Sequence, residues 1–329
     1  MEFALFLGCN IPIRLKQYET ASRAVLHKLG VRLVDVPEFN CCGYPLRNID
    51  LKAFVLSSAR NLALAERQGL NMMVLCKCGF GTMRMAQHLI KENASLREEI
   101  NTILATEGLK YEGDIEVKHL LTVLFSDVGT EAIKEKVTRP YENLKIATHY
   151  GCHALRPSSI LQFDDPVAPT IFDQLVEVTG AESVDWPAKL DCCGGPLLGT
   201  NDELSLDFAE KKLDSANKAG AHYIAAGCVF CQIQFDTVQK SMQSNRGSNH
   251  RVPSILYPQL LGLCMEIEKD VLGLASNQID VTGVERFLAT NGPGLPNPPS
   301  VLDARRRGAT TEAYEQYSAR RSDRRQRRR

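Results

Sequence analysis

The sequence of 329 residues predicts an α/β protein with two tandem units, each a small domain built on a parallel sheet. Three observations lead to this prediction. A pattern of five cysteines occurs twice, short apolar runs alternate with helix-period segments in both copies, and the lead cysteines follow apolar runs. We place the first unit and a helical connector at 1–140, the second unit at 141–270, and a C-terminal extension at 271–329.

The internal repeat is defined by ten of the eleven cysteines. The first series is Cys9, Cys41, Cys42, Cys76 and Cys78, and the second is Cys152, Cys192, Cys193, Cys228 and Cys231. The lead cysteine precedes the adjacent pair by 32 residues in the first series and by 40 in the second. Both adjacent pairs begin a Cys-Cys-Gly-x-Pro-Leu motif, at 41–46 and 192–197. Because the spacings differ only by the length of a loop, we interpret the two series as one repeated unit.

Each unit shows the same order of predicted elements. Apolar runs at 3–7 and 144–147 indicate buried strands that end just before the lead cysteines. Apolar residues then recur at helical spacing, at Leu51, Val55, Leu62 and Ala65 in the first unit and at Leu206, Ala209, Leu213 and Ala216 in the second. A glycine ends each predicted helix, and a further short strand follows at 72–75 or 223–226. This order favours a parallel sheet, and we expect the five cysteines of each unit to meet on loops at the carboxyl ends of its strands.

Residues 92–141 separate the two units. Helical character at 94–106 and again at 117–137 predicts a helical connector, with a boundary near Arg139-Pro140.

The two chain ends carry no predicted site. The apolar start lacks a basic region and contains Glu2, so we expect a buried strand there and not a signal peptide, and a lipoprotein signal before Cys9 would be too short. No apolar run is long enough to span a bilayer, and we expect a cytoplasmic protein.

Residues 300–329 contain ten Arg against two Asp and two Glu. We expect this Arg-rich tail to be a disordered, solvated appendage that binds no nucleic acid, although its charge would also suit nucleic acid or an acidic partner.

The number and spacing of the cysteines favour metal or redox chemistry. A chain of this size needs no disulfide framework, and a disulfide between adjacent cysteines would be strained. Four thiolates suffice for a zinc ion or an ordinary iron–sulfur cluster, whereas each unit offers five. The glycine after each adjacent pair permits a tight turn, from which a backbone N–H can donate to a cluster sulfur.

The repeated motif resembles that of the CCG-domain, or cysteine-rich domain, proteins, above all the heterodisulfide reductase B subunits. The resemblance covers about residues 1–270 and extends to Leu7-Gly8-Cys9, Pro12, Arg14, Tyr18-Glu19, 59–63 and 259–263. It implies that each set of five cysteines binds a non-cubane [4Fe-4S] cluster, and that a disulfide substrate or carrier-bound sulfur lies between the two clusters. It also implies an electron-relay subunit with ferredoxin-like [4Fe-4S] clusters and a flavin subunit, because this chain lacks the relay motif.

One departure from the family pattern concerns the first unit. The second set ends in Cys228-Val229-Phe230-Cys231, whereas the first ends in Cys76-Lys77-Cys78-Gly79, with glycine in place of the last cysteine. An irregular loop would still bring Cys78 to the first cluster. A regular strand end would leave that site with four ligands or a different cluster.

A few other residues are candidates for a role at the site. His153 could donate a proton to a leaving thiolate, or it could be a structural imidazole. We expect His149 to be packed or exposed, Lys77 to be solvated unless it offsets cluster charge, and Cys264 to be a small core residue. The remaining histidines follow no ligand spacing, and we assign them no role.

The favoured function is an oxidoreductase subunit acting on disulfides, thiols or persulfides. The alternative is a non-catalytic electron-transfer subunit of a complex that resembles glycolate or lactate oxidases. A structural zinc protein is a third possibility, and nucleotide binding has no motif to support it.

Overall fold

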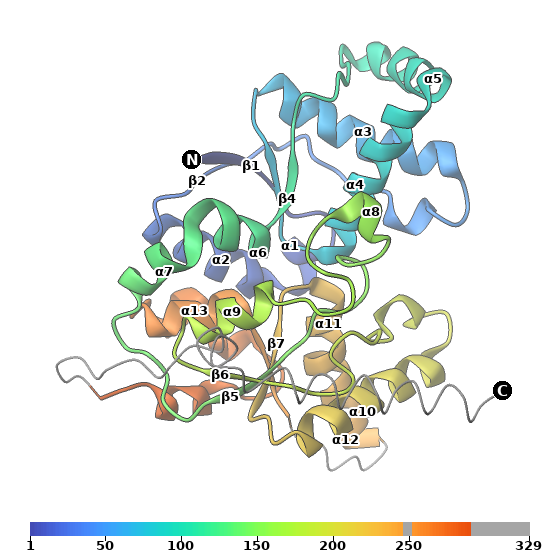
Figure 1. Cartoon of the computed structure of the whole chain (residues 1–329). Helices are drawn as coiled ribbons and strands as arrows, with labels where there is room; N and C mark the ends of the chain where they lie inside the picture. Colours follow the sequence, from blue (N-terminus) through green and yellow to red (C-terminus); the bar gives the residue numbers. More distant parts are fainter. Residues whose placement is uncertain (246–251, 291–329) are drawn as a thin grey trace. The chain divides into compact units, whose positions relative to one another are not determined.

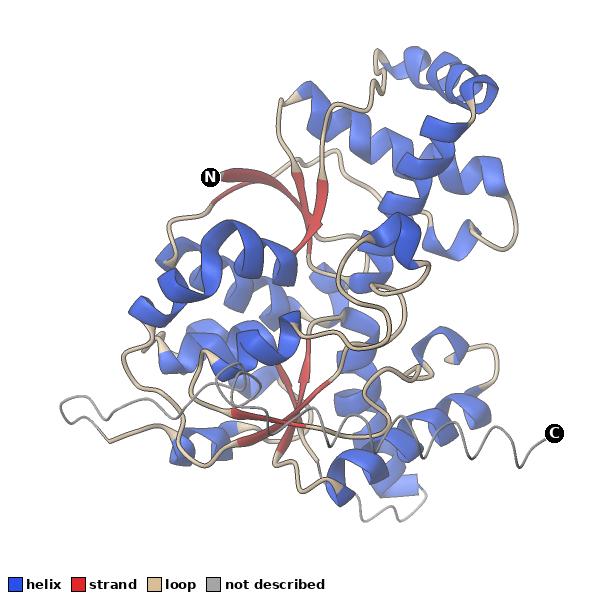
Figure 2. Cartoon of the chain, viewed as in Figure 1, coloured by secondary structure: helices blue, strands red, loops and turns tan. Residues whose placement is uncertain are grey.

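Two four-stranded parallel sheets form the framework of the computed structural model, which describes residues 1–245 and 252–290 (Figures 1 and 2). The first sheet has the order β2 (Arg32–Val34), β1 (Glu2–Phe6), β3 (Met72–Val74) and β4 (Val117–His119). The second has the order β6 (Glu182–Val184), β5 (Lys145–Thr148), β7 (Tyr223–Ala226) and β8 (Ser254–Leu256). The identical order confirms the predicted α/β class with a repeated parallel sheet.

The first strand of each half occupies a central position in its sheet. Ala4 of β1 pairs with Val34 on one side and with Met72 on the other. Ala147 of β5 pairs in the same way with Val184 and Ile224. Strands covered by helices on both faces are apolar along nearly their whole length, which explains the uninterrupted apolar runs in the sequence.

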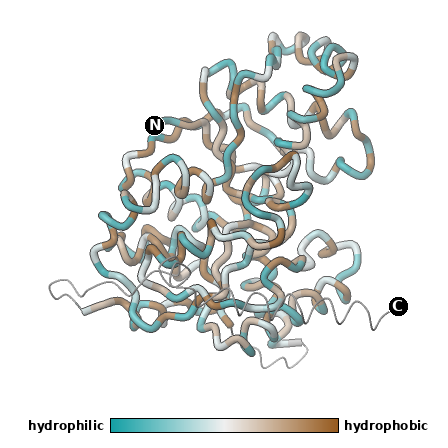
Figure 3. The backbone as a smooth tube through the Cα atoms, viewed as in Figure 1, coloured by the Kyte–Doolittle hydropathy of each residue, from teal (hydrophilic) through white to brown (hydrophobic). Residues whose placement is uncertain are grey.

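The helices of the first half cover the first sheet. They are α1 (Ile11–Arg14), α2 (Lys16–Lys28), α3 (Leu51–Arg67), α4 (Lys77–Glu92), α5 (Ala94–Leu104), α6 (Leu120–Thr122) and α7 (Thr130–Lys136). The Asp50 side chain caps α3 by accepting a hydrogen bond from the backbone N–H of Ala53. Figure 3 shows hydrophobic segments interspersed with hydrophilic ones along the helices, as amphipathic packing requires.

The helices of the second half repeat part of this arrangement. They are α8 (Ser158–Leu161), α9 (Ile171–Glu177), α10 (Asp202–Lys218), α11 (Val229–Ile233), α12 (Gln239–Asn245), α13 (Tyr257–Cys264) and α14 (Lys269–Leu272). The short 3₁₀ turns η1 (Tyr44–Leu46) and η4 (Gly195–Leu197) follow the two Cys-Cys-Gly motifs. As predicted, a long helix, α3 or α10, comes after each motif.

The connector differs from the prediction. Residues 94–104 are helical as expected, but residues 117–119 form β4, which pairs with β3 and completes the first sheet. A π-helical turn, η3 (Val123–Gly129), then precedes α7. The predicted helix at 117–137 was therefore wrong in its first turn, because a three-residue strand is too short to show a period of two.

Residues beyond 270 also contribute to the core. Leu272, Leu274, Val281 and Val284 are buried, and α14 packs against α2 of the first half. The structure groups residues 1–290 into one compact unit. The division into domains at 140 and 270 stays a prediction, and the Arg-rich tail lies outside the described residues. None of the described helices combines the length and apolar character needed to cross a membrane.

Candidate metal centre

The first and the fourth cysteine of each series lie beyond the carboxyl ends of the central strands. Cys9 follows β1 and Cys76 follows β3, while Cys152 follows β5 and Cys228 follows β7. Because these strands are parallel, their carboxyl ends share one edge of each sheet. The structure thus places these cysteines at the strand ends where the sequence predicted them.

The glycine of each Cys-Cys-Gly motif has a backbone conformation that other residues adopt at a cost. Gly43 and Gly194 have φ angles of 83° and 82°. A Cβ atom on Gly194 would lie 2.6 Å from the backbone oxygen of Ser205, and one on Gly43 would lie 2.8 Å from that of Phe54. Only glycine therefore lets each cysteine pair turn tightly against the following helix.

Hydrogen bonds fasten both motifs to neighbouring helices. Ser57 and Ser58 of α3 donate to the backbone oxygens of Cys41 and Cys42, at 2.8 and 2.7 Å. In the second half, Gln234 donates to the oxygen of Cys193 at 2.9 Å. Backbone carbonyls that are fixed in this way hold the sulfur atoms in a preset arrangement, as a metal centre requires.

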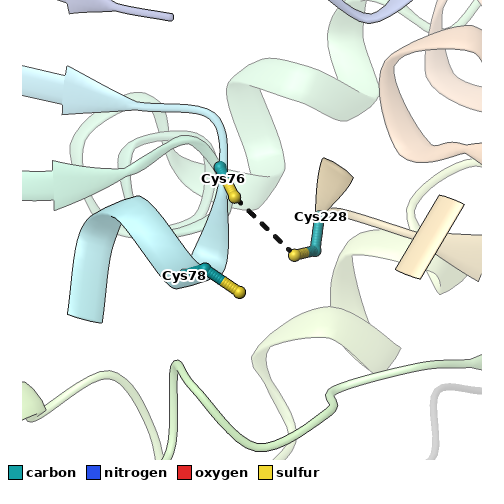
Figure 4. A group of neighbouring side chains, drawn as sticks. All are labelled: Cys76, Cys78 and Cys228. Atoms are coloured by element: carbon teal, nitrogen blue, oxygen red, sulfur yellow. Dashed lines mark hydrogen bonds between the residues drawn. The ribbon is translucent and has the colours of Figure 1, made fainter. Parts of the chain in front are cut away.

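The two cysteine sets meet at one point. The Sγ atoms of Cys76 and Cys228 are 3.9 Å apart, and Cys78 lies close enough that the three sulfurs fall within 4.8 Å of one another (Figure 4). The Cys78 Sγ atom is also 2.9 Å from Nδ1 of His153. The departure in the first unit therefore places Cys78 beside residues of the second set as well as beside Cys76.

The local backbone explains the position of Cys78. Cys76 is extended, with φ of −98° and ψ of 126°, and serves as the N-cap of α4. The helix begins at Lys77, so Cys78 lies in its first turn and not on a continuing strand. The sequence left open whether this segment is an irregular loop or a regular strand end, and the structure shows neither, because α4 begins directly after Cys76. The role of Cys78 as a ligand of the first cluster stays a prediction.

A histidine joins the second set. The Nε2 atom of His149 lies 3.1 Å from the Sγ atom of Cys231, and both lie within 4.8 Å of the sulfur of Cys193. The other ring nitrogen of His149 is buried without a hydrogen-bond partner among the described residues. His149 is packed, which is one of the two states expected from the sequence, but the sequence analysis did not predict its contact with Cys231. Its position directly after β5, the strand that precedes Cys152, was the one sequence feature that could have indicated this contact.

Hydrogen bonds among the thiols shift their pKa values in opposite directions. Hydrogen bonds from Cys152 and, to a smaller extent, from Cys193 lower the pKa of Cys192 to about 2. The same Cys192–Cys193 bond raises the pKa of Cys193 to about 12. In the first set, the bond from Cys42 lowers the pKa of Cys41 to about 5. Backbone N–H groups of Gly194 and Gly195 also point at the sulfurs of Cys192 and Cys193, both at 3.4 Å. Each set therefore holds at least one sulfur that favours the thiolate form.

Lys77 is buried, contrary to the expectation that it is solvated. Only 2% of its surface is exposed, and its Nζ atom donates to the backbone oxygens of His149 and Tyr150 at 2.9 and 3.0 Å. The aromatic rings of Tyr150 and Phe172 lie beside the ammonium group. These contacts could not be predicted from the sequence, since they join residues more than 70 positions apart.

The chain's cysteines fit iron–sulfur clusters. No disulfide joins any of the eleven cysteines, and all of them lie within the described ranges. Cys193, Cys228 and Cys231 are buried, Cys152 and Cys192 are half-buried, and Cys9 is exposed. Cys264 is buried in α13 and donates to the Leu261 oxygen, which confirms it as a core residue apart from both sets. Soft thiolate donors gathered without disulfides suit iron–sulfur clusters or zinc.

Comparisons with known proteins agree with this chemistry. Residues 3–77 and 146–236 match the CCG family model, described as a cysteine-rich domain. The B subunit of the ferredoxin:CoB-CoM heterodisulfide reductase of Methanosarcina mazei is 35% identical over 84% of this chain and 94% of that protein. The 8-methylmenaquinol:fumarate reductase membrane anchor subunit of Wolinella succinogenes is 34% identical over 85% of this chain and 98% of that protein.

A solved structure supports the fold alone. The crystal structure of a hypothetical protein from Helicobacter pylori superposes with a TM-score of 0.68 at 19% identity, covering 86% of this chain and 52% of that chain.

The family match falls on both repeats and includes nine of the ten repeated cysteines, from Cys9 to Cys76 and from Cys152 to Cys231. The chain therefore belongs to the CCG cysteine-rich domain family, and it is similar over most of its length to B subunits of heterodisulfide reductase.

Proposed function

We propose that this chain is the disulfide-handling subunit of an iron–sulfur oxidoreductase complex, in which a disulfide or persulfide is reduced or formed between two [4Fe-4S] clusters. The observation that supports this most directly is the meeting of the two cysteine sets, with the sulfurs of Cys76 and Cys228 only 3.9 Å apart. Clusters bound through these neighbouring cysteines could each act on one sulfur of the same S–S bond.

The proposed ligands are the ten repeated cysteines. Cys9, Cys41, Cys42, Cys76 and Cys78 would hold the first cluster, and Cys152, Cys192, Cys193, Cys228 and Cys231 the second. Five ligands for each cluster favour the non-cubane type, as the family resemblance implies. When bound, such clusters supply single electrons and iron sites for sulfur. The protein contributes the fixed turns, the backbone N–H donors at Gly194 and Gly195, and a largely buried second set.

His153 is the proposed proton donor. Its Nδ1 atom lies 2.9 Å from the Cys78 sulfur, and its ring meets that of Tyr44 edge-on at 5.4 Å. Burial lowers the pKa of His153, so the imidazole is neutral near pH 7. A neutral imidazole can hold a proton at Nδ1 and hydrogen-bond through it to a sulfur that gains charge.

The proposed partners are further subunits of a complex. The Methanosarcina mazei protein is named as a subunit of a ferredoxin-linked reductase, which supports partner subunits for this chain as well. The relay subunit with ferredoxin-like [4Fe-4S] clusters and the flavin subunit are proposed from the family resemblance alone. Cys9 is the most exposed cysteine of the first set, whereas Cys41 and Cys76 are half-buried. The substrate would be a small disulfide or thiol, or sulfur bound to a carrier.

A second candidate function is electron transfer without disulfide chemistry. The Wolinella succinogenes relative is named as a subunit of a quinol:fumarate reductase, which favours this candidate. The two functions predict the same clusters and differ only in whether the chain itself acts on sulfur.

Anaerobic purification with assays of iron, acid-labile sulfide and zinc is the first test. Two clusters correspond to about eight iron and eight sulfide per chain. The loaded chain is then given an artificial electron donor and a panel of low-molecular-weight disulfides, and released thiol is measured. Thiol release at the expense of the donor supports the proposal. Clusters without thiol release favour the electron carrier, and zinc without iron contradicts both.

A further inference from the structure

Lys77 is a buried lysine with no carboxylate partner in the part of the chain that the structure describes. Its ammonium group donates hydrogen bonds to two backbone oxygens, those of His149 and Tyr150. Among residues 1–245 and 252–290, no ion pair joins Lys77 to a carboxylate. Carbonyl dipoles and aromatic rings offset only part of the cost of burying a charge, so a negative group is expected nearby.

The candidates for that negative group are the thiols that line a cavity together with Lys77. All five cysteines of the second set line it, whereas the first set contributes Cys78 alone. Its backbone lies between Cys76 and Cys78 of the first half, yet its side chain reaches the carbonyls that precede Cys152. Lys77 is therefore part of the first repeat in the sequence, but its ammonium group lies beside the loop that carries the lead cysteine of the second set.

Lys189 provides an internal comparison. It lies over the ring of the same Tyr150, at 5.4 Å from its centre, while Lys77 lies at 5.8 Å. Unlike Lys77, it forms a 2.6 Å ion pair with Asp173. Two lysines thus flank one aromatic ring, and among the described residues the carboxylate partner is present for one of them only.

We propose that Lys77 is the counter-ion of the metal centre held by the second cysteine set, and that its charge strengthens metal binding there and makes that centre easier to reduce. A metal centre with several thiolates carries net negative charge, and a fixed cation stabilises each added electron. The inference depends on the proposed function only for the identity of the metal, since a zinc–thiolate centre would also be anionic.

The test uses the full chain, four lysine variants and one reference variant. Lys77→Met removes the charge and the donor, Lys77→Gln removes the charge but keeps a donor, and Lys77→Arg keeps both. Lys189→Met is the matched control. The reference variant, Cys152→Ser/Cys192→Ser, identifies the signal of the second centre as the one that it lacks.

The midpoint potential of the second centre is measured by electron paramagnetic resonance after anaerobic loading with iron and sulfide. We expect a lower potential in Lys77→Met and Lys77→Gln and a potential near the wild-type value in Lys77→Arg and Lys189→Met. An unchanged potential in Lys77→Met, or a fall in Lys77→Met that Lys77→Gln does not share, would overturn the inference.

A second measurement separates this inference from the proposed function. The rise in Tm when the metal-free, reduced chain takes up Zn²⁺ reports metal binding without redox chemistry. We expect a smaller rise in Lys77→Met than in the wild type or Lys189→Met. If the chain takes up zinc but never iron, the proposed function fails, while a smaller rise in Lys77→Met still supports the counter-ion. Equal rises in all variants contradict the counter-ion whichever metal is present.

Discussion

The sulfur atoms of Cys76 and Cys228 lie 3.9 Å apart although 152 residues separate them in the chain. Each sulfur follows a central strand of its own half, β3 or β7. Their contact joins the carboxyl edges of two separate sheets. The arrangement makes each cysteine set part of the other's surroundings.

Loss of one second-set cysteine should remove metal from that set. Cys228 is buried and its sulfur contacts that of Cys76. Its replacement by serine leaves the ligand set one thiolate short. We expect Cys228→Ser to bind roughly half the iron and sulfide of the wild type. Cys264→Ser is the control, since Cys264 lies in α13 away from both sets, and it should keep the full content. Equal iron content in the two variants would contradict the assignment of Cys228.

The turn at Gly194 should tolerate no side chain. Gly194→Ala would place a Cβ atom 2.6 Å from the Ser205 oxygen at a φ angle of 82°, and we expect it to lower the free energy of unfolding by about 3 kcal/mol. Gly220→Ala has a similar φ angle of 73° but open space around it, and should cost about 1–2 kcal/mol. Urea denaturation of the reduced, metal-free chain measures both. Similar losses of unfolding free energy in the two variants would show that the structure adjusts to a Cβ atom at Gly194 at little cost.

Removing the His153 imidazole should slow thiol release without loss of metal. A positioned proton donor typically contributes a factor of about 10²–10⁴, so we expect His153→Gln to fall by about 100-fold in turnover at unchanged iron content. His222 is suited as a control, because it accepts a hydrogen bond from the Lys145 N–H and stacks on Phe287, outside both cysteine sets. His222→Gln should keep its turnover. A His153→Gln variant that also keeps its turnover would assign His153 a structural role.

Stability at high pH should depend on Lys212. This buried lysine donates to the backbone oxygens of Ala188 and Asp191, and burial lowers its pKa from 10.5 to about 8. Between these pH values the unfolded chain holds a proton that the folded chain has released, so the free energy of unfolding rises with pH. The rise attributable to Lys212 is up to about 3 kcal/mol.

The difference between the wild type and Lys212→Met isolates this contribution, because the thiols titrate in both. Urea denaturation of the reduced, metal-free chains at pH 7.5, 8.5 and 9.5 should show the wild type gaining stability relative to the variant at each step. Parallel curves would mean that Lys212 keeps an ordinary pKa in the folded chain.

Local sequence patterns were sufficient to predict the parts of the fold that are apolar and repeated. The runs that form β1, β3, β5 and β7 are buried except at the first residue of β1 and of β5, and the Cys-Cys-Gly motifs stand out because their spacing recurs. The edge strands β2, β4, β6 and β8 escaped prediction, since each has only three residues and too few positions to display a periodicity.

The parts of the site that depend on long-range contacts were not predictable. Nothing near Cys78 in the sequence indicates that it lies beside His153, and nothing near Lys77 indicates burial. Both follow from the point where α4 begins and from the packing of that first turn against the loop after β5. Such contacts are a property of the assembled halves, whereas spacing and periodicity describe one segment at a time.

The first two turns of α4 have a consequence for how the gene could be recombined with that of a relative. Gly81 packs so closely against the His153 carbonyl that a Cβ atom there would lie 2.5 Å from its oxygen, and Lys77 binds the carbonyls of His149 and Tyr150. A chimera that joined the second repeat of this chain to the first repeat of a relative would receive a foreign α4 at that interface. A functional chimera would therefore need to take residues 77–153 from one parent, a segment that crosses the border between the two repeats.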